Sequence, residues 1–165
     1  FAPGYPAYRI ILIPALVAHS WEIDDVAIYA SNHTWMILTY PIGFAIALIG
    51  LIGKLELSPF DAPEAESEIV SGVLSEYSGR GLALFHIAKN VELVVGLALI
   101  SAFYLGGIGN LLFFTIKTLA LLMLISLLQS TLTRLRIDQT VGLWWQIGAL
   151  LSLGQLLIII LARIL

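Results

Sequence analysis

Long apolar stretches constrain this chain more than any other feature. Residues 34–53 carry no charged side chain, and a helix needs roughly 20 such residues to cross a hydrocarbon core of about 30 Å. Further apolar stretches of similar length occupy residues 82–105, 111–132 and 141–161. Because lipid offers no hydrogen bonds to the backbone, each stretch should be a helix. The sequence therefore predicts an all-α integral membrane protein, a bundle of transmembrane helices with four spans.

The composition and the positions of Pro and Gly agree with one transmembrane domain over residues 1–165. The chain is 59% hydrophobic and 12% charged, with a mean hydropathy of +0.98. Pro41 is expected to kink the first span, and "GGIGN", Gly106–Asn110, predicts a tight hairpin. Residues 10–18 are apolar but short, which leaves a truncated span and an interfacial segment as alternatives. The start at Phe1 leads us to expect a longer natural chain.

Several classes of function are excluded. The chain has no Cys, so it can hold neither an iron–sulfur cluster nor a thiolate-bound metal. Its net charge of -3, without a basic run, excludes nucleic acid as a partner. No glycine-rich phosphate loop, HExxH or GxSxG motif occurs, and "GGIGN" has no strand before it. We expect no catalytic centre, metal or other cofactor on this chain.

Two polar segments separate the spans, at residues 54–80 and 133–140. Cytoplasmic segments of membrane proteins are enriched in Lys and Arg near the span ends. Lys54, Arg80, Arg134 and Arg136 fall on one side, whereas the other side has "GGIGN" and the acidic "EIDD" and, as one exception, Arg163. The two segments are therefore predicted to be cytoplasmic loops of a multi-pass protein of a prokaryotic cell membrane.

The first loop is acidic. In "SPFDAPEAESEIVSG", residues 58–72, Asp61 followed by Pro63 and Glu64 predicts a helix start. On such a helix Glu64 and Glu68 share a face, where like charges repel. If the helix is exposed, the carboxylates only solubilise a loop. If it packs against the spans, burial and repulsion raise their pKa values, and protons can exchange near neutral pH.

Four ionisable residues lie within the spans. His86, Lys89 and Glu92 form a stripe at every third position, and we expect Lys89 to pair with Glu92, either as a structural ion pair or as a proton relay. His86 is either bonded to a neighbouring carbonyl or a proton carrier. Lys117 either extends toward the membrane surface or lines a polar path with Thr118 and, further along, Gln129.

Two strings resemble a known family. "PFDAPEAESEIVSG…SEYSG", residues 59–79, and "RLRIDQ", residues 134–139, are similar to the two cytoplasmic motifs of the NADH dehydrogenase subunit 1 family. That family includes subunits of respiratory complex I, membrane-bound energy-converting [NiFe] hydrogenases, formate hydrogenlyase and the sulfane sulfur reductase complex. The resemblance covers residue 54 to the end and implies the C-terminal half of a subunit of about eight spans.

The resemblance also implies a role for the charged residues. The subunit would couple electron transfer in a hydrophilic redox arm to ion movement, holding no cofactor itself. Its partners would be redox-arm subunits of the hydrogenase large and small type, which carry the NiFe centre and iron–sulfur clusters, and other membrane subunits, including antiporter-like ones. The implied acidic path comprises Asp61, Glu64, Glu66, Glu68, Glu76, Lys89 and Glu92, with Arg80, Arg134, Arg136 and Asp138 as loop partners and His86 and Lys117 as candidate proton carriers.

Departures from the complex I pattern indicate the branch. "GKLEL", residues 53–57, stands where quinone-reducing members commonly read Ala-Glu-Thr-Asn-Arg, so Lys54 and Leu57 replace a Glu and an Arg. In "ALFHIAKN", residues 83–90, Lys89 replaces a usual Glu. These changes favour a ferredoxin-dependent membrane-bound [NiFe] hydrogenase that moves H⁺ or Na⁺.

Other interpretations stay open at this point. One is the quinone-site membrane subunit of complex I, and another is the membrane subunit of a sulfane sulfur reductase. A secondary cation transporter belongs to a different class and would predict inverted repeats, which the sequence does not show. A purely structural anchor would tolerate neutral residues at Glu64, Glu68 and Lys89.

Overall fold

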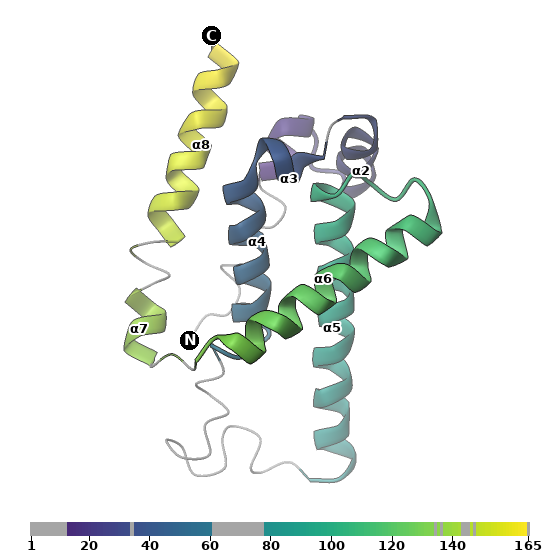
Figure 1. Cartoon of the computed structure of the whole chain (residues 1–165), viewed down its shortest axis with the longest axis vertical. Helices are drawn as coiled ribbons and strands as arrows, with labels where there is room; N and C mark the ends of the chain where they lie inside the picture. Colours follow the sequence, from purple (N-terminus) through teal and green to yellow (C-terminus); the bar gives the residue numbers. More distant parts are fainter. Residues whose placement is uncertain are drawn as a thin grey trace.

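The computed structural model of the chain describes residues 13–33, 35–60, 78–133, 135, 137–142, 146 and 148–164. Within these ranges every regular element is a helix, which confirms the predicted all-α class. Residues 13–18 are helical, so the described part of the short N-terminal stretch forms less than a span. The named helices that follow are α2 (Ile23–Asn32), α3 (Met36–Thr39), α4 (Pro41–Lys54), α5 (Arg80–Tyr104), α6 (Leu111–Thr131), α7 (Ile137–Gly142) and α8 (Ala149–Ile164) (Figure 1).

Two of the described helices, α5 and α6, are long and apolar enough to cross a membrane. The 25 residues of α5 extend about 38 Å at a rise of 1.5 Å per residue. Most of α6 faces outward with apolar side chains, including Phe113, Ile116 and Met123, which is typical of a lipid-facing surface. In Figure 1 α6 runs obliquely across α4 and α5. The chain is thus an integral membrane protein, as predicted.

The first predicted span is divided into two helices. The short α3 ends before Tyr40, and α4 begins with Pro41 in its first turn. Proline lacks an N–H group and its ring collides with the preceding helical turn, so it is tolerated at a helix start but not in the interior. The predicted kink at Pro41 is therefore a complete break, and α4 keeps only 14 residues.

The fourth predicted span is described only in part. The short α7 ends at Gly142, and α8 begins at Ala149 with 16 residues. Residues 146 and 148, the described positions between them, have π-helical geometry. The four predicted spans therefore correspond to two helices of spanning length, α5 and α6, and two shorter apolar helices, α4 and α8.

The hairpin between α5 and α6 packs on α2. Gly106 and Gly107 have φ angles of 85° and 70°, in the left-handed region that favours glycine. A Cβ on Gly107 would lie 2.8 Å from the Ala27 carbonyl oxygen and 2.6 Å from Ser31 Cβ. Glycine therefore allows the close approach, and the hairpin predicted from "GGIGN" is observed. Figure 1 shows α2 and α3 at this same end of the molecule.

The centre of the core lies between α4 and α5. The two helices run in opposite directions, because Gly43 lies near Tyr104 and Leu51 near Gly96. Buried apolar side chains from both helices fill the interface, and α8 contacts the opposite side of α4. Since α4 is the shorter helix, its C-terminal end lies beside the middle of α5 (Figure 1). The principal buried members are Leu48, Leu51, Ile52, Leu97, Ile100 and Phe103.

Candidate functional site

Two ion pairs join the C-terminal end of α4 to the middle of α5. Lys54, the last residue of α4, pairs with Glu92, and the Lys89 Nζ atom donates a hydrogen bond to Glu56 Oε2 at 3.3 Å. The four side chains are between 31% and 43% exposed, so none is fully solvated. We call Lys54, Glu56, Lys89 and Glu92 the charged cluster.

The charged cluster lies far from both ends of α5. Lys89 is nine residues after Arg80, which corresponds to about 14 Å along the helix. Glu92 is one turn further along, near the midpoint of α5. If α5 spans the hydrocarbon, the cluster lies near its midplane, where charged side chains are costly unless they are paired. Pairing between α4 and α5 meets that condition for both carboxylates and both ammonium groups.

This geometry corrects one sequence prediction. Lys89 and Glu92 were predicted to pair with each other along α5, and that pairing is wrong: each is paired across the helix interface with a residue at the end of α4. Lys54, used in the orientation prediction, lies level with Glu92, because α4 stops beside the middle of α5. Arg80 is exposed at the first position of α5.

The segment after α4 connects the two predicted cytoplasmic loops. Leu55 and Phe60 are buried, with 2% and 7% of their surface exposed. Between them, the Pro59 carbonyl accepts a hydrogen bond from the Leu135 N–H at 3.0 Å. This backbone hydrogen bond joins the described start of the first loop, three residues after Glu56, to Leu135 in the second loop.

Most of the predicted loop residues cannot be placed in this geometry. Asp138 belongs to α7, and His86 is exposed on α5, between Arg80 and the charged cluster. The remaining loop residues of the predicted path lie outside the described residues, namely Asp61, Glu64, Glu66, Glu68, Glu76, Arg134 and Arg136. Among the residues that the structure does describe, no three His, Asp or Glu side chains gather closely enough to hold a metal ion.

Lys117 lies away from the charged cluster. Its ammonium donates a hydrogen bond to the Leu105 carbonyl at the C-terminal end of α5, and it is 5.5 Å from the centre of the Trp35 ring. A cation is favoured at both places, by the helix dipole and by the aromatic face. Of the two alternatives for Lys117, this geometry agrees with extension toward the hairpin end rather than along α6 toward Gln129.

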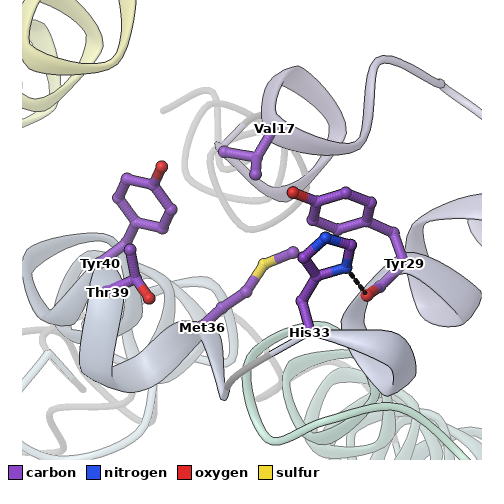
Figure 2. A pocket seen from close by; sticks show the side chains of 6 residues that line it. All are labelled: Val17, Tyr29, His33, Met36, Thr39 and Tyr40. Carbon is purple, nitrogen blue, oxygen red and sulfur yellow. Dashed lines mark hydrogen bonds between the residues drawn. The ribbon is translucent and has the colours of Figure 1, made fainter. Parts of the chain in front are cut away.

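A small cavity occupies the opposite end of α4. It has a volume of about 160 Å³ and is lined by six residues, shown in Figure 2: Val17, Tyr29, His33, Met36, Thr39 and Tyr40. The His33 ring stacks on Tyr29, with ring centres 4.0 Å apart, and its Nδ1 lies 3.1 Å from the Tyr29 carbonyl oxygen. No charged carboxylate or ammonium group lines this cavity, so we do not place the charge-based function there.

Sequence reasoning missed Glu56 and the role of Lys54. Both stand in "GKLEL", which we interpreted as the end of a span and as a departure from a motif. A signal was present, since two opposite charges two residues apart follow an apolar run. The sequence did not show that α4 ends beside the middle of α5. That arrangement is what brings Lys54 and Glu56 opposite Glu92 and Lys89.

Lys89 and Glu92 are three residues apart on α5, so the two ion pairs lie close together at the α4–α5 interface. With two ammonium and two carboxylate groups, the charged cluster has no net charge while all four side chains are ionised. Ionisable residues within membrane spans usually pair in this way and mark candidate functional sites.

Comparisons with known proteins identify the relatives. The NADH dehydrogenase family matches residues 5–160. An NADH-quinone oxidoreductase subunit of Geobacter sulfurreducens is 35% identical over 153 residues, which is 89% of this chain and 46% of that protein. The corresponding NADH-quinone oxidoreductase subunit of Carboxydothermus hydrogenoformans is 32% identical over 162 residues, 93% of this chain and 46% of that protein. The chain thus spans a little under half the length of these relatives.

Proposed function

Since the chain belongs to the NADH dehydrogenase subunit 1 family, we propose that it forms part of the membrane subunit of an ion-translocating oxidoreductase complex. The observation that carries this proposal is the charged cluster between α4 and α5. A structural helix pair in a membrane needs no charges at half its depth, since apolar packing alone would hold it. Two ion pairs between the helices at that depth favour a role in moving ions.

The proposed mechanism is electrostatic. A change of charge at a neighbouring redox centre would alter the proton occupancy of the acidic loop, residues 54–80, which includes Glu56. The Leu135–Pro59 hydrogen bond would carry a displacement of either loop to the end of α4. The charged cluster would then change partners and bias proton occupancy at Lys89 and Glu92.

The relatives favour the quinone-reducing type of complex. Both the Geobacter sulfurreducens and the Carboxydothermus hydrogenoformans proteins are named as subunits of an NADH-quinone oxidoreductase. A chain of this type would contribute to the membrane side of a quinone site and would bind no redox cofactor itself. It would assemble with hydrophilic redox-arm subunits and other membrane subunits in the cytoplasmic membrane of a prokaryote.

A ferredoxin-dependent hydrogenase is the second candidate. The observation that favours it is the pair of lysines in the charged cluster, Lys54 and Lys89, at positions where the complex I pattern carries Glu. Both lysines are paired with carboxylates, so they are built into the α4–α5 interface rather than scattered on the surface. In this case the NiFe centre and iron–sulfur clusters would lie on partner subunits, and a sulfane sulfur reductase would be the related variant without nickel.

Purification of the intact complex from its native membrane tests the proposal. Mass spectrometry of the co-purifying subunits and elemental analysis would separate the candidates. NADH-driven quinone reduction by a nickel-free complex would support the quinone-reducing type, and nickel with a hydrogenase large subunit would support the second candidate. A chain that purifies without any redox partner would contradict both.

A further inference from the structure

Helix α4 ends in a turn that normally requires glycine. The Leu57 N–H donates to the Ile52 carbonyl at 3.1 Å, and the Glu56 N–H donates to the Gly53 carbonyl at 3.4 Å. This pair of hydrogen bonds defines a Schellman motif, in which the residue at the Glu56 position is left-handed. Glu56 has a φ of 54°, as the motif demands. Glycine, and less often asparagine, is the usual residue there.

Glutamate is a poor choice for this backbone position. Its Cβ comes close to the following carbonyl oxygen in the left-handed conformation, whereas glycine has no such contact. The hydrogen bonds of the motif are made by backbone atoms, so they do not need the Glu56 side chain. Something other than helix termination must therefore account for the glutamate.

The Glu56 side chain has one described partner. Its Oε2 accepts a hydrogen bond from Lys89 Nζ at 3.3 Å, and the two side chains are 37% and 32% exposed. Lys89 lies within α5, nine residues from its start. The second ion pair of the charged cluster joins Lys54 to Glu92.

We propose that Glu56 is a positioning residue, whose carboxylate at a strained helix end holds the Lys89 ammonium at the α4–α5 interface. The left-handed backbone directs the Glu56 side chain across the interface toward α5, rather than onward along α4. This role rests on the proposed function, because the purpose of a held Lys89 is ion coupling. Glu56 was not among the residues of the acidic path that the family resemblance implied.

Replacement by glycine separates this proposal from a purely structural role. In Glu56→Gly the backbone strain and the carboxylate disappear together, and in Glu56→Gln only the charge is lost. We would reconstitute the intact complex with each variant in proteoliposomes, and measure translocated ions per electron and the thermal unfolding midpoint. Glu56→Asp serves as the conservative rescue. Glu22→Gln, at an exposed position before α2, serves as the matched control.

We expect Glu56→Gly and Glu56→Gln to lower the number of ions per electron at least twofold. Glu56→Asp should retain more than half of the wild-type ratio, and Glu22→Gln all of it. Glu56→Gly should unfold at a temperature no lower than Glu56→Gln, because it relieves the backbone. A Glu56→Gly complex that keeps the wild-type ratio would overturn the proposal.

A second measurement does not depend on the proposed function. Reductive methylation of the purified complex at one fixed pH, followed by peptide mass spectrometry, reports how fast the Lys89 amine reacts. In Glu56→Gly and Glu56→Gln this rate should be at least twofold higher than in wild type, because the Lys89 side chain is no longer held at the α4–α5 interface. An unchanged rate would show that Glu56 does not hold Lys89. If wild type moves no ions but the rate rises in the variants, the proposed function fails while the positioning role stands.

Discussion

Two ion pairs join side chains of opposite charge across the α4–α5 interface. Lys54 and Glu92 are each only partly exposed, so removing one leaves the other without its counter-charge. The penalty of an unpaired charge generally exceeds what the intact pair contributes to stability. The pair is therefore better tested by a double variant than by single ones.

Lys54→Gln and Glu92→Gln should each lower the free energy of unfolding by about 1 kcal/mol, since both side chains retain some solvent contact. The double variant should lose less than the sum of the two, because no unpaired charge remains. Unfolding midpoints of the detergent-solubilised complex measure this difference. Asp24→Asn, which removes an exposed carboxylate on α2, is the control. Strictly additive losses would show that Lys54 and Glu92 do not interact.

Lys117 is predicted to stabilise the hairpin end of α5. Lys117→Met removes both the hydrogen bond to the Leu105 carbonyl and the cation over Trp35, and should lower the free energy of unfolding by roughly 1–2 kcal/mol. Lys117→Arg should recover at least half of the loss, since guanidinium also binds carbonyls and aromatic faces. Thermal unfolding of the purified complex is the measurement. A Lys117→Met protein as stable as wild type would show that neither contact matters.

At the scale of helices, the contact between α4 and α5 depends on Gly96. A Cβ at this position would overlap Leu51 Cδ1, and Leu51 is 98% buried and has little room to move. Gly96 is therefore a point of close approach between α4 and α5. The helix pair can keep its ion pairs in register only while this approach is maintained.

Gly96→Ala should lower the free energy of unfolding by about 1–3 kcal/mol through overpacking. Leu51→Ala in the same chain should relieve the overlap, so the double variant should be more stable than the sum of the single changes predicts. Gly154→Ala on α8 is the matched control, because a Cβ there meets nothing within 4 Å. The control should be neutral or stabilising by up to about 1 kcal/mol. Equal effects at both glycines would contradict the packing argument.

The positions of the main helices could be predicted from the sequence, but their lengths could be predicted only in part. The apolar runs and the "GGIGN" string located α5, α6 and their hairpin, because lipid requires complete internal hydrogen bonding. The shorter α4 was not predicted, since hydropathy cannot distinguish a continuous span from a helix that Pro41 restarts. Because the early end of α4 was not predicted, the role of Glu56 was missed. Glu56 lies opposite Lys89 only because α4 ends beside the middle of α5.

At the scale of the whole molecule, the apolar surface and the predicted orientation can be tested together. The chain contains no Cys, so each introduced Cys can be identified by its peptide. Met123, on the outward face of α6, is 76% exposed, whereas Ser78 lies before α5 and Glu22 before α2. Single cysteines at these positions should differ in their reaction with a membrane-impermeant maleimide.

Cys at Met123 should stay unlabelled in sealed vesicles of either orientation, since lipid or a neighbouring protein covers α6. Cys at Ser78 should react only when the cytoplasmic side faces outward, and Cys at Glu22 only when the opposite side does. Mass spectrometry of labelled peptides gives the result, with detergent-opened vesicles as the positive control for Ser78 and Glu22. Labelling of Ser78 and Glu22 from the same side would refute the predicted orientation.

The bond between Leu135 N–H and the Pro59 carbonyl has an evolutionary consequence. Main-chain atoms form this hydrogen bond, so the contact between the two loops is compatible with almost any pair of side chains. Side chains at both positions can therefore change during evolution while the contact is kept. Correlated substitutions at positions 59 and 135 are not expected to reveal it. Proline is the one residue without a backbone N–H, so Leu135→Pro is the substitution that would remove this hydrogen bond.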